Sequence, residues 1–134
     1  MKAYLAGPMR GYPEYNFPTF QAAARILRQR GYEVWSPAER DESDGLVVAG
    51  MAGTERGAVK DLRYYMQFDL PEVLKADVLV MLPGWKASEG AMLEAHVAVK
   101  CRIPVYEWAD IVNLSSLQVV PLAENMQQPV LELQ

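Results

Sequence analysis

The segment 76–82 (ADVLVML) is the feature that most limits the fold of this chain. After Asp77 it carries only apolar side chains, so both faces of the strand that it predicts must be buried. A strand buried on both faces is typical of the centre of a parallel sheet, because helices cover such a sheet on each side. The segment therefore favours an α/β fold over an all-helical or all-β one.

Strands and helices are expected to alternate along the rest of the chain. Further strands are predicted at 2–6, 32–35 and 103–106, and helices at 18–30, 58–68 and 88–100. Pro71 is expected to break the middle helix and to restart a short helical turn up to Lys75. Alternating elements with short links predict a parallel sheet with helices on both faces.

The size of the chain predicts a single domain spanning 1–134. Two parts of it lack a clear pattern. The stretch 41–57 reads as an irregular insertion or lid, and 107–134 reads as a C-terminal tail that forms an edge strand or packs on a second subunit. The net charge of −4 argues against a general nucleic-acid surface, which needs a basic face.

Several classes of site are excluded by residue counts. The only cysteine, Cys101, cannot form an internal disulfide; it is expected to be a buried, inert thiol in a cytoplasmic protein. One histidine and one cysteine cannot build a zinc cluster, so we expect no metal and no cofactor. No apolar run is long enough to span a membrane.

A serine, a glycine and a glutamate follow the central strand as Ser88, Gly90 and Glu94. Ser88 can cap the helix, and Gly90 leaves open the first turn, where free N–H groups and the helix dipole favour an anion. Glu94 has apolar neighbours, among which an unpaired charge would cost several kcal/mol. It is therefore either a functional carboxylate or a solvent-facing residue that pairs with Lys100, and the helix pattern alone leaves both open.

A glycine-bounded turn at 7–11 (GPMRG) follows the first strand. Such turns build ligand crevices at the carboxyl ends of parallel strands. This one matches neither the dinucleotide fingerprint nor the P-loop. Its Arg10 offers a fixed charge for a phosphate or carboxylate, with a solvated surface arginine as the alternative. Asp69 should lie near the same edge, although a turn or capping role is the simpler interpretation of this residue alone.

Together these pieces resemble the nucleoside 2-deoxyribosyltransferase superfamily, in particular its phage and bacterial branch of unknown function. The resemblance covers about 3–107. Its matching pieces are 4–11 (YLAGPMRG), 16–18 (NFP), Asp69 ahead of the central strand, and 82–85 (LPGW) leading to Ser88-x-Gly90-x-x-x-Glu94. It implies a flavodoxin-like or Rossmann-like parallel sheet of four to five strands with helices on both faces.

The resemblance also implies an activity, cleavage of the N-glycosidic bond of 2′-deoxynucleosides or their 5′-monophosphates. Glu94 matches the family's nucleophile, Tyr4 the tyrosine that orients it, and Asp69 the aspartate that contacts the base and assists its departure. The implied reaction is a double displacement through a covalent glutamyl-sugar intermediate. The substrate and its phosphate would be held by Gly7, Arg10, Gly11, Ser88 and Gly90.

Ser88 bears on the choice of substrate. Family members that act on free nucleosides tend to have aspartate there, whereas the nucleotide hydrolases have serine and an arginine that matches Arg10. A serine, helix N–H groups and an arginine would hold a 5′-phosphate that an aspartate would repel. We therefore expect a 5′-monophosphate substrate, although Pro8 stands where the hydrolases have serine.

A nucleotide-sensing domain without catalysis is the alternative, because related Rossmann-like domains bind nucleotides without cleaving them. A sensor has no need of a carboxylate at C1′ of the sugar, so Glu94 distinguishes the two. No sequence feature separates hydrolysis from transfer to a second base. The resemblance further implies a homo-oligomer with a small-molecule partner.

Overall fold

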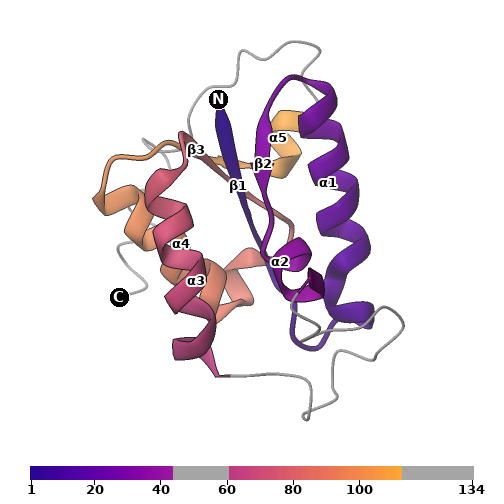
Figure 1. Ribbon diagram of the computed structural model, residues 1–134, viewed down its shortest axis with the longest axis vertical. Coiled ribbons are helices and arrows are strands. Elements are labelled where there is room, and N and C mark those ends of the chain that lie inside the picture. The colour runs from indigo at the N-terminus through magenta and orange to yellow at the C-terminus, as the bar shows by residue number, and fades with distance from the viewer. Residues whose placement is uncertain (44–60, 113–134) are drawn as a thin grey trace.

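A computed structural model describes residues 1–43 and 61–112 of the chain (Figure 1). Its four strands form one parallel sheet in the order β2-β1-β3-β4. They are β1 (Lys2–Ala6), β2 (Glu33–Trp35), β3 (Val78–Met81) and β4 (Val105–Glu107). The predicted parallel α/β sheet is confirmed, and β3 lies inside it with all of its residues buried.

Helices cover both faces of the sheet, as Figure 1 shows. On one face lie α1 (Phe17–Gln29) and α5 (Trp108–Val112), and on the other lie α3 (Leu62–Lys75) and α4 (Glu89–Lys100). The helix α2 (Pro37–Ser43) follows β2, and two 3-10 turns, η1 (Pro13–Asn16) and η3 (Trp85–Ala87), follow β1 and β3. The layers are those predicted for a sheet buried on both sides.

The alternation of β1 divides the core into two layers. Ala3 and Leu5 point toward α1, while Tyr4 and Ala6 point toward α4. Burial of apolar surface is worth about 25 cal/mol per Å², so these two layers supply the main driving force for folding. They also fix the direction of Tyr4, because a shift of β1 by one residue would move its side chain to the other face.

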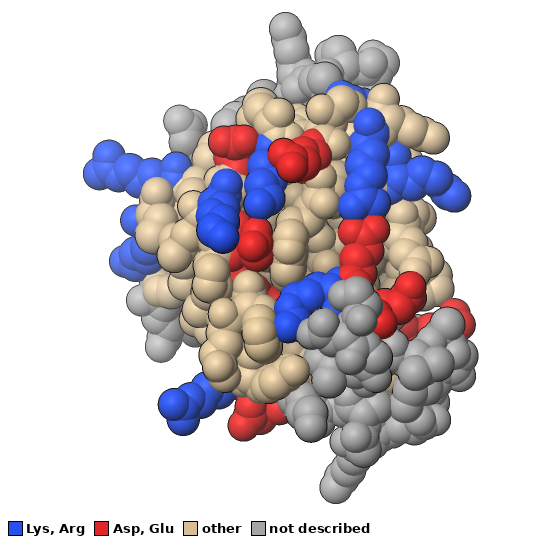
Figure 2. All heavy atoms as spheres, in the orientation of Figure 1, with Lys and Arg blue, Asp and Glu red and all other residues tan. Residues whose placement is uncertain are grey.

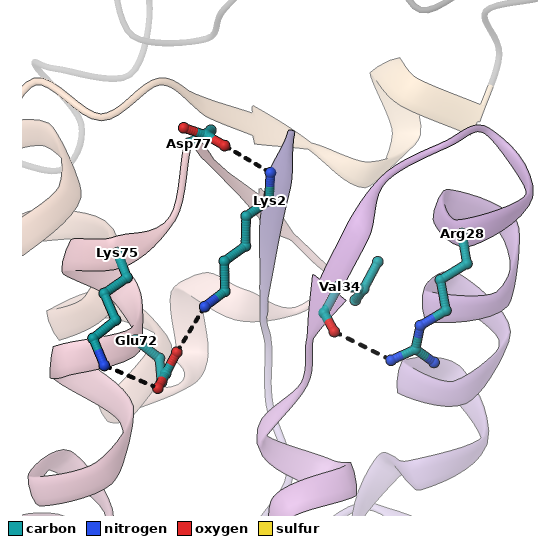
Figure 3. Close-up of polar contacts among 6 residues, drawn as sticks. All are labelled: Lys2, Arg28, Val34, Glu72, Lys75 and Asp77. Atoms are coloured by element: carbon teal, nitrogen blue, oxygen red, sulfur yellow. Dashed lines mark hydrogen bonds and ion pairs between the residues drawn. The ribbon is translucent and has the colours of Figure 1, made fainter.

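Polar contacts tie the helices to the start of the strands (Figure 3). Lys2 donates its backbone N–H to Asp77 at 2.7 Å and its ammonium group to Glu72 of α3 at 3.0 Å. Lys75 lies 3.6 Å from the same Glu72 carboxylate, and the bond from Lys2 lowers the Glu72 pKa. These contacts lie near the amino ends of β1 and β3, away from the carboxyl ends where the chain turns into η1 and η3.

Two expectations about the elements are wrong. Pro71 lies inside α3, which continues to Lys75; Pro71 and Gln67, whose carbonyl loses its helical partner, are both exposed, so water can replace the missing bond. Residues 41–43 belong to α2 rather than to an irregular insertion. Of the predicted tail, the structure describes 107–112. Glu107 ends β4, and the helix α5 that follows is tied to α1 by Arg30, which donates to the Ile111 carbonyl at 2.8 Å.

The surface of the described part also differs from one expectation. Cys101 is exposed rather than buried, because it caps the carboxyl end of α4 outside the packed face. On the face drawn in Figure 2, basic and acidic side chains are interspersed. Within residues 1–43 and 61–112, no helix has the length and apolar character needed to cross a membrane. The remaining parts of the 41–57 stretch and of the tail, 44–57 and 113–134, lie outside the described residues.

Candidate active site

The centre of the site is a hydrogen bond between Tyr4 and Glu94, two side chains buried in the protein. Tyr4 is 0% exposed and Glu94 is 4% exposed, and the Tyr4 hydroxyl donates to Oε2 of Glu94. The Tyr4 ring is held by stacking on Trp35 at 5.1 Å, with 13° between the ring planes. Glu94 therefore neither faces solvent nor pairs with Lys100, which is exposed.

Burial controls the charge of this carboxyl group. It is the largest cause of the raised Glu94 pKa, and the negative charge of Asp69 adds to it, whereas the bond from Tyr4 acts in the opposite direction. The pKa of Tyr4 is raised as well, so its hydroxyl keeps the proton that it donates. An ionised Glu94 therefore has one hydrogen-bond donor in place. A further partner, such as a ligand, is needed to offset the cost of burying its charge.

A cavity of about 420 Å³ opens beside Glu94 at the carboxyl end of the sheet. Its wall brings together most of the predicted site residues, namely Gly7, Arg10, Asp69, Ser88, Gly90 and Glu94. Two predicted residues are not on the wall: Tyr4 lies behind Glu94, and Gly11 lies outside the cavity with a φ of 83°. A volume of this size is within the range of small-molecule sites.

The glycines of the site have different reasons to be there. A Cβ on Gly7 would lie 2.8 Å from Cβ of Leu82, so the close approach of the turn to the end of β3 requires glycine. The positive φ of Gly11 also favours glycine. At Gly90 a Cβ would meet only Leu62 and Met66, at 3.5 and 3.6 Å, which is ordinary contact. The absence of a side chain at Gly90 therefore leaves room in the cavity rather than relieving a clash.

Ser88 is the N-cap of α4, as predicted. Its Oγ accepts a hydrogen bond from the Ala91 N–H at 3.2 Å. The cap satisfies one of the free N–H groups of the first turn and leaves the amino end of α4 at the cavity wall, where the helix dipole favours an anion.

Asp69 reaches the cavity from the middle of α3. Its side chain is 6% exposed, and burial together with the charge of Asp41 raises its pKa to about 7. The cation of Arg40 acts in the opposite direction. Among the residues that the structure describes, none makes a hydrogen bond to the Asp69 carboxyl group. Asp69 is therefore no capping residue but a carboxyl group that can hold or release a proton near neutral pH.

Asp41 is a cavity residue that the sequence analysis missed. It is 4% exposed, lies on α2 and lines the same wall as Asp69. The sequence signal for this helix was the Ser36-Pro37 pair. Proline is common at the first position of a helix, so Pro37 can mark the start of a helix as well as the end of a strand. Read in that way, Asp41 falls one turn into a helix that starts at the carboxyl edge of the sheet.

An unusual backbone conformation shapes part of the cavity wall. Glu14, Tyr15 and Asn16 all have positive φ angles, of 52°, 52° and 64°, which non-glycine residues rarely adopt. Asn16 holds the turn by donating its side-chain amide to the Pro8 carbonyl at 2.8 Å. Strain of this kind tends to occur at functional sites, and here it places the buried Tyr15 on the cavity wall.

A family model described as a domain of unknown function matches residues 1–107 of the chain. The chain belongs to this family, DUF4406. No curated protein matches it. A solved structure of a 2-deoxyribosyltransferase from the psychrotolerant bacterium Bacillus psychrosaccharolyticus is similar to it, with a TM-score of 0.55 and 19% identity over 91% of this chain and 78% of that one. The resemblance to this superfamily is thereby confirmed at the level of the fold.

The site of this DUF4406 protein predicts a measurable effect of the Tyr4 bond. Changing Tyr4 to phenylalanine should raise the pKa of Glu94 further, because it removes the donor that favours the charged form. Carbon-13 NMR titration of the side-chain carboxyl groups would measure this, with the Glu94 signal assigned by its loss in Glu94→Gln. Tyr32→Phe, a half-buried tyrosine on the other layer, is the control. An unchanged or lowered Glu94 pKa would contradict the assignment of Tyr4 as the partner.

Proposed function

We propose that this DUF4406 protein cleaves the N-glycosidic bond of 2′-deoxynucleosides or their 5′-monophosphates and passes the sugar to water or to a second base. One observation carries the proposal: Glu94 is buried, is aimed by the Tyr4 hydroxyl, and lies on the wall of a cavity large enough for a nucleotide. Burying a carboxylate with a single hydrogen-bond donor destabilises the fold, so a purely structural role does not explain its position. The fold shared with a 2-deoxyribosyltransferase supports the same reading.

The chemistry uses the two carboxyl groups in different states. Ionised Glu94 attacks C1′ of the sugar, an ester bond forms and the C1′–N bond breaks. Asp69, whose pKa is about 7, donates its proton to the departing base. Water or a second base then attacks C1′, the ester bond breaks, Glu94 leaves as a carboxylate and Asp69 takes up the proton that the nucleophile loses. A nucleophile and a separate acid are the two groups that retaining glycosidases need.

The wall beside α4 suits the phosphate of a 5′-monophosphate. It combines the Ser88 cap, the amino end of the helix and Arg10 at the exposed mouth of the cavity. Helix N–H groups and an arginine are both favourable for a phosphate dianion. Position 88 itself carries no carboxylate to repel it, and the nearest acidic residue on this wall is Glu89, in the first turn of α4. We therefore place the 5′ end of the sugar at Ser88 and the base toward Asp69.

The activity is tested by incubating the purified protein with each 2′-deoxynucleoside and each 5′-monophosphate and measuring released base by chromatography. Base release that depends on the protein supports the proposal. Adding a second free base and looking for a new nucleoside or nucleotide separates transfer from hydrolysis. Tight binding of these compounds with no release from any of them would reject the enzyme and favour the sensing alternative.

The phosphate assignment predicts a selective defect in an Arg10→Ala variant. It should lower kcat/KM for 5′-monophosphates about 10- to 100-fold, as expected for the loss of one charged contact, and should change that for free nucleosides little. Arg25→Ala, an exposed arginine on α1, is the matched control. Equal losses for both substrate types would place Arg10 away from the phosphate.

A further inference from the structure

We propose that Asp41 and Asp69 form an acidic wall that selects bases with an exocyclic amino group beside a ring nitrogen, as in cytosine and adenine, over uracil and thymine. The proposal rests on the proposed function and deepens it by naming the class of base. Two groups carry it, both more than nine-tenths buried and both on the cavity wall.

The two aspartates come from neighbouring elements that are locked together. Arg40, which precedes Asp41 on α2, lies with its guanidinium carbon 3.6 Å from the centre of the Phe68 ring, which precedes Asp69 on α3. Such a contact is a cation–π interaction. The guanidinium is also 3.9 Å from Oδ1 of Asp41. The chain neighbours of the two carboxyl groups thus hold α2 against α3, and the carboxyl groups face the same space.

Asp69 is the observation that points to a ligand. A carboxyl group this buried ordinarily has hydrogen-bond partners, yet within residues 1–43 and 61–112 none is found for Asp69. Asp69 lines the wall of the cavity. A molecule that fills the cavity would therefore supply the missing partner, and it must offer groups that match a carboxyl group.

Which base fits the wall depends on the hydrogen-bond donors and acceptors that the two carboxyl groups present. The negative charge of Asp41 acts on Asp69 and favours the protonated form of Asp69. A charged Asp41 can only accept hydrogen bonds, whereas a protonated Asp69 can also donate one. The amino group of cytosine or adenine supplies N–H donors to Asp41, and the neighbouring ring nitrogen accepts from Asp69. Protonation of a ring nitrogen also makes the base a better leaving group.

Uracil and thymine fit this wall less well. Their only N–H on the same edge lies between two carbonyl oxygens. In the orientation that places the cytosine amino group at Asp41, uracil and thymine place their O4 carbonyl oxygen there instead, and this oxygen is repelled by the negative charge of Asp41. The two nucleotides dCMP and dUMP differ only at this edge, so their comparison isolates the effect.

The test compares base release from dCMP and dUMP by the wild-type protein and by an Asp41→Asn variant. The wild type should prefer dCMP at least about 10-fold in kcat/KM. In Asp41→Asn the dCMP/dUMP ratio should fall about 10- to 100-fold, because the amide can donate to a carbonyl oxygen. Glu42→Gln, the exposed neighbour on α2, should leave the ratio unchanged. Asp41→Ala, which removes the charge without adding a donor, serves if the asparagine variant folds poorly.

The outcomes separate this inference from the proposed function. Equal rates for both nucleotides, a preference for dUMP, or an unchanged ratio in a folded Asp41 variant would overturn the acidic-wall assignment while leaving the activity in place. No release from any deoxynucleoside or 5′-monophosphate would reject the proposed function. In that case calorimetric titration with dCMP and dUMP decides this inference, and tighter binding of dCMP by the wild type alone supports it.

Discussion

Glu94→Gln should lower the rate of base release by about 1,000-fold or more while leaving the fold intact. Removal of a covalent nucleophile has effects of this order or larger in other enzymes. Glutamine fills the volume of Glu94 in its buried position, and its amide oxygen can still accept the bond from Tyr4. The amide cannot form an ester with the sugar. The free energy of unfolding should be unchanged or higher near neutral pH, because the variant removes a group whose charged form is disfavoured by burial.

A direct assay of the intermediate makes this prediction sharper. Acid quenching of the wild-type reaction, followed by mass spectrometry of peptides, should find a deoxyribosyl adduct on the peptide that contains Glu94 and none in Glu94→Gln. Glu33→Gln is the matched control, because Glu33 is exposed at the start of β2, at the opposite end of the strands. Activity of Glu94→Gln close to that of the wild type, or an adduct on another peptide, would show that Glu94 is not the nucleophile.

The position of Glu94 could be predicted because two strong patterns meet there. The apolar run of β3 required a buried central strand, and Ser88 marked the start of the helix that follows it. Together they put the second turn of α4 beside the carboxyl end of β1. The pattern could not decide whether Glu94 faced the sheet, since the residues around it are apolar on every side. That was decided by packing, which places the Tyr4 hydroxyl on its carboxylate.

The wrongly predicted elements share a cause. Helix-breaking residues such as proline and glycine affect secondary structure less than tertiary packing does. Pro71 was read as a break, yet α3 continues through it because Val73, one turn before β3, is buried in the core. The helix α2 is short and lies next to a stretch rich in glycine, so it contains too few turns for a helical repeat of apolar residues to be detected. The position of Asp41 on the cavity wall was missed for the same reason. For an acidic residue on a short helix, the sequence pattern does not show whether the side chain faces a cavity or the solvent.

The second large effect concerns Asp69 and is a dependence of stability on pH. The folded state holds the Asp69 proton with a pKa of about 7, against 3.8 for an unperturbed aspartate. The folded state therefore binds this proton more tightly than the unfolded state. The stabilisation is complete below about pH 4 and is lost as the pH rises through about 7. The raised pKa of Glu94 acts in the same direction.

The size of this effect follows from the shift. One pKa unit corresponds to about 1.4 kcal/mol, so deprotonation of Asp69 should lower the free energy of unfolding by roughly 4 kcal/mol between pH 4 and 8. Asp69→Asn should flatten most of that slope, because asparagine does not titrate. Urea unfolding at a series of pH values would measure it, with Asp110→Asn, an exposed aspartate on α5, as the control. A slope that survives in Asp69→Asn would assign the proton to another group.

The same variant should lose activity in a way that a purely structural residue would not. If Asp69 delivers the proton to the departing base, Asp69→Asn should lower the rate about 100-fold, within the range for loss of a general acid. The loss should be largest below pH 7, where Asp69 carries its proton in the wild type, and the fall in wild-type activity near pH 7 should disappear. A nucleoside analogue with a leaving group that needs no proton, such as a nitrophenyl deoxyriboside, should be cleaved at nearly the wild-type rate. Equal losses for the analogue and the natural substrate would show that Asp69 acts on binding or folding rather than on the proton.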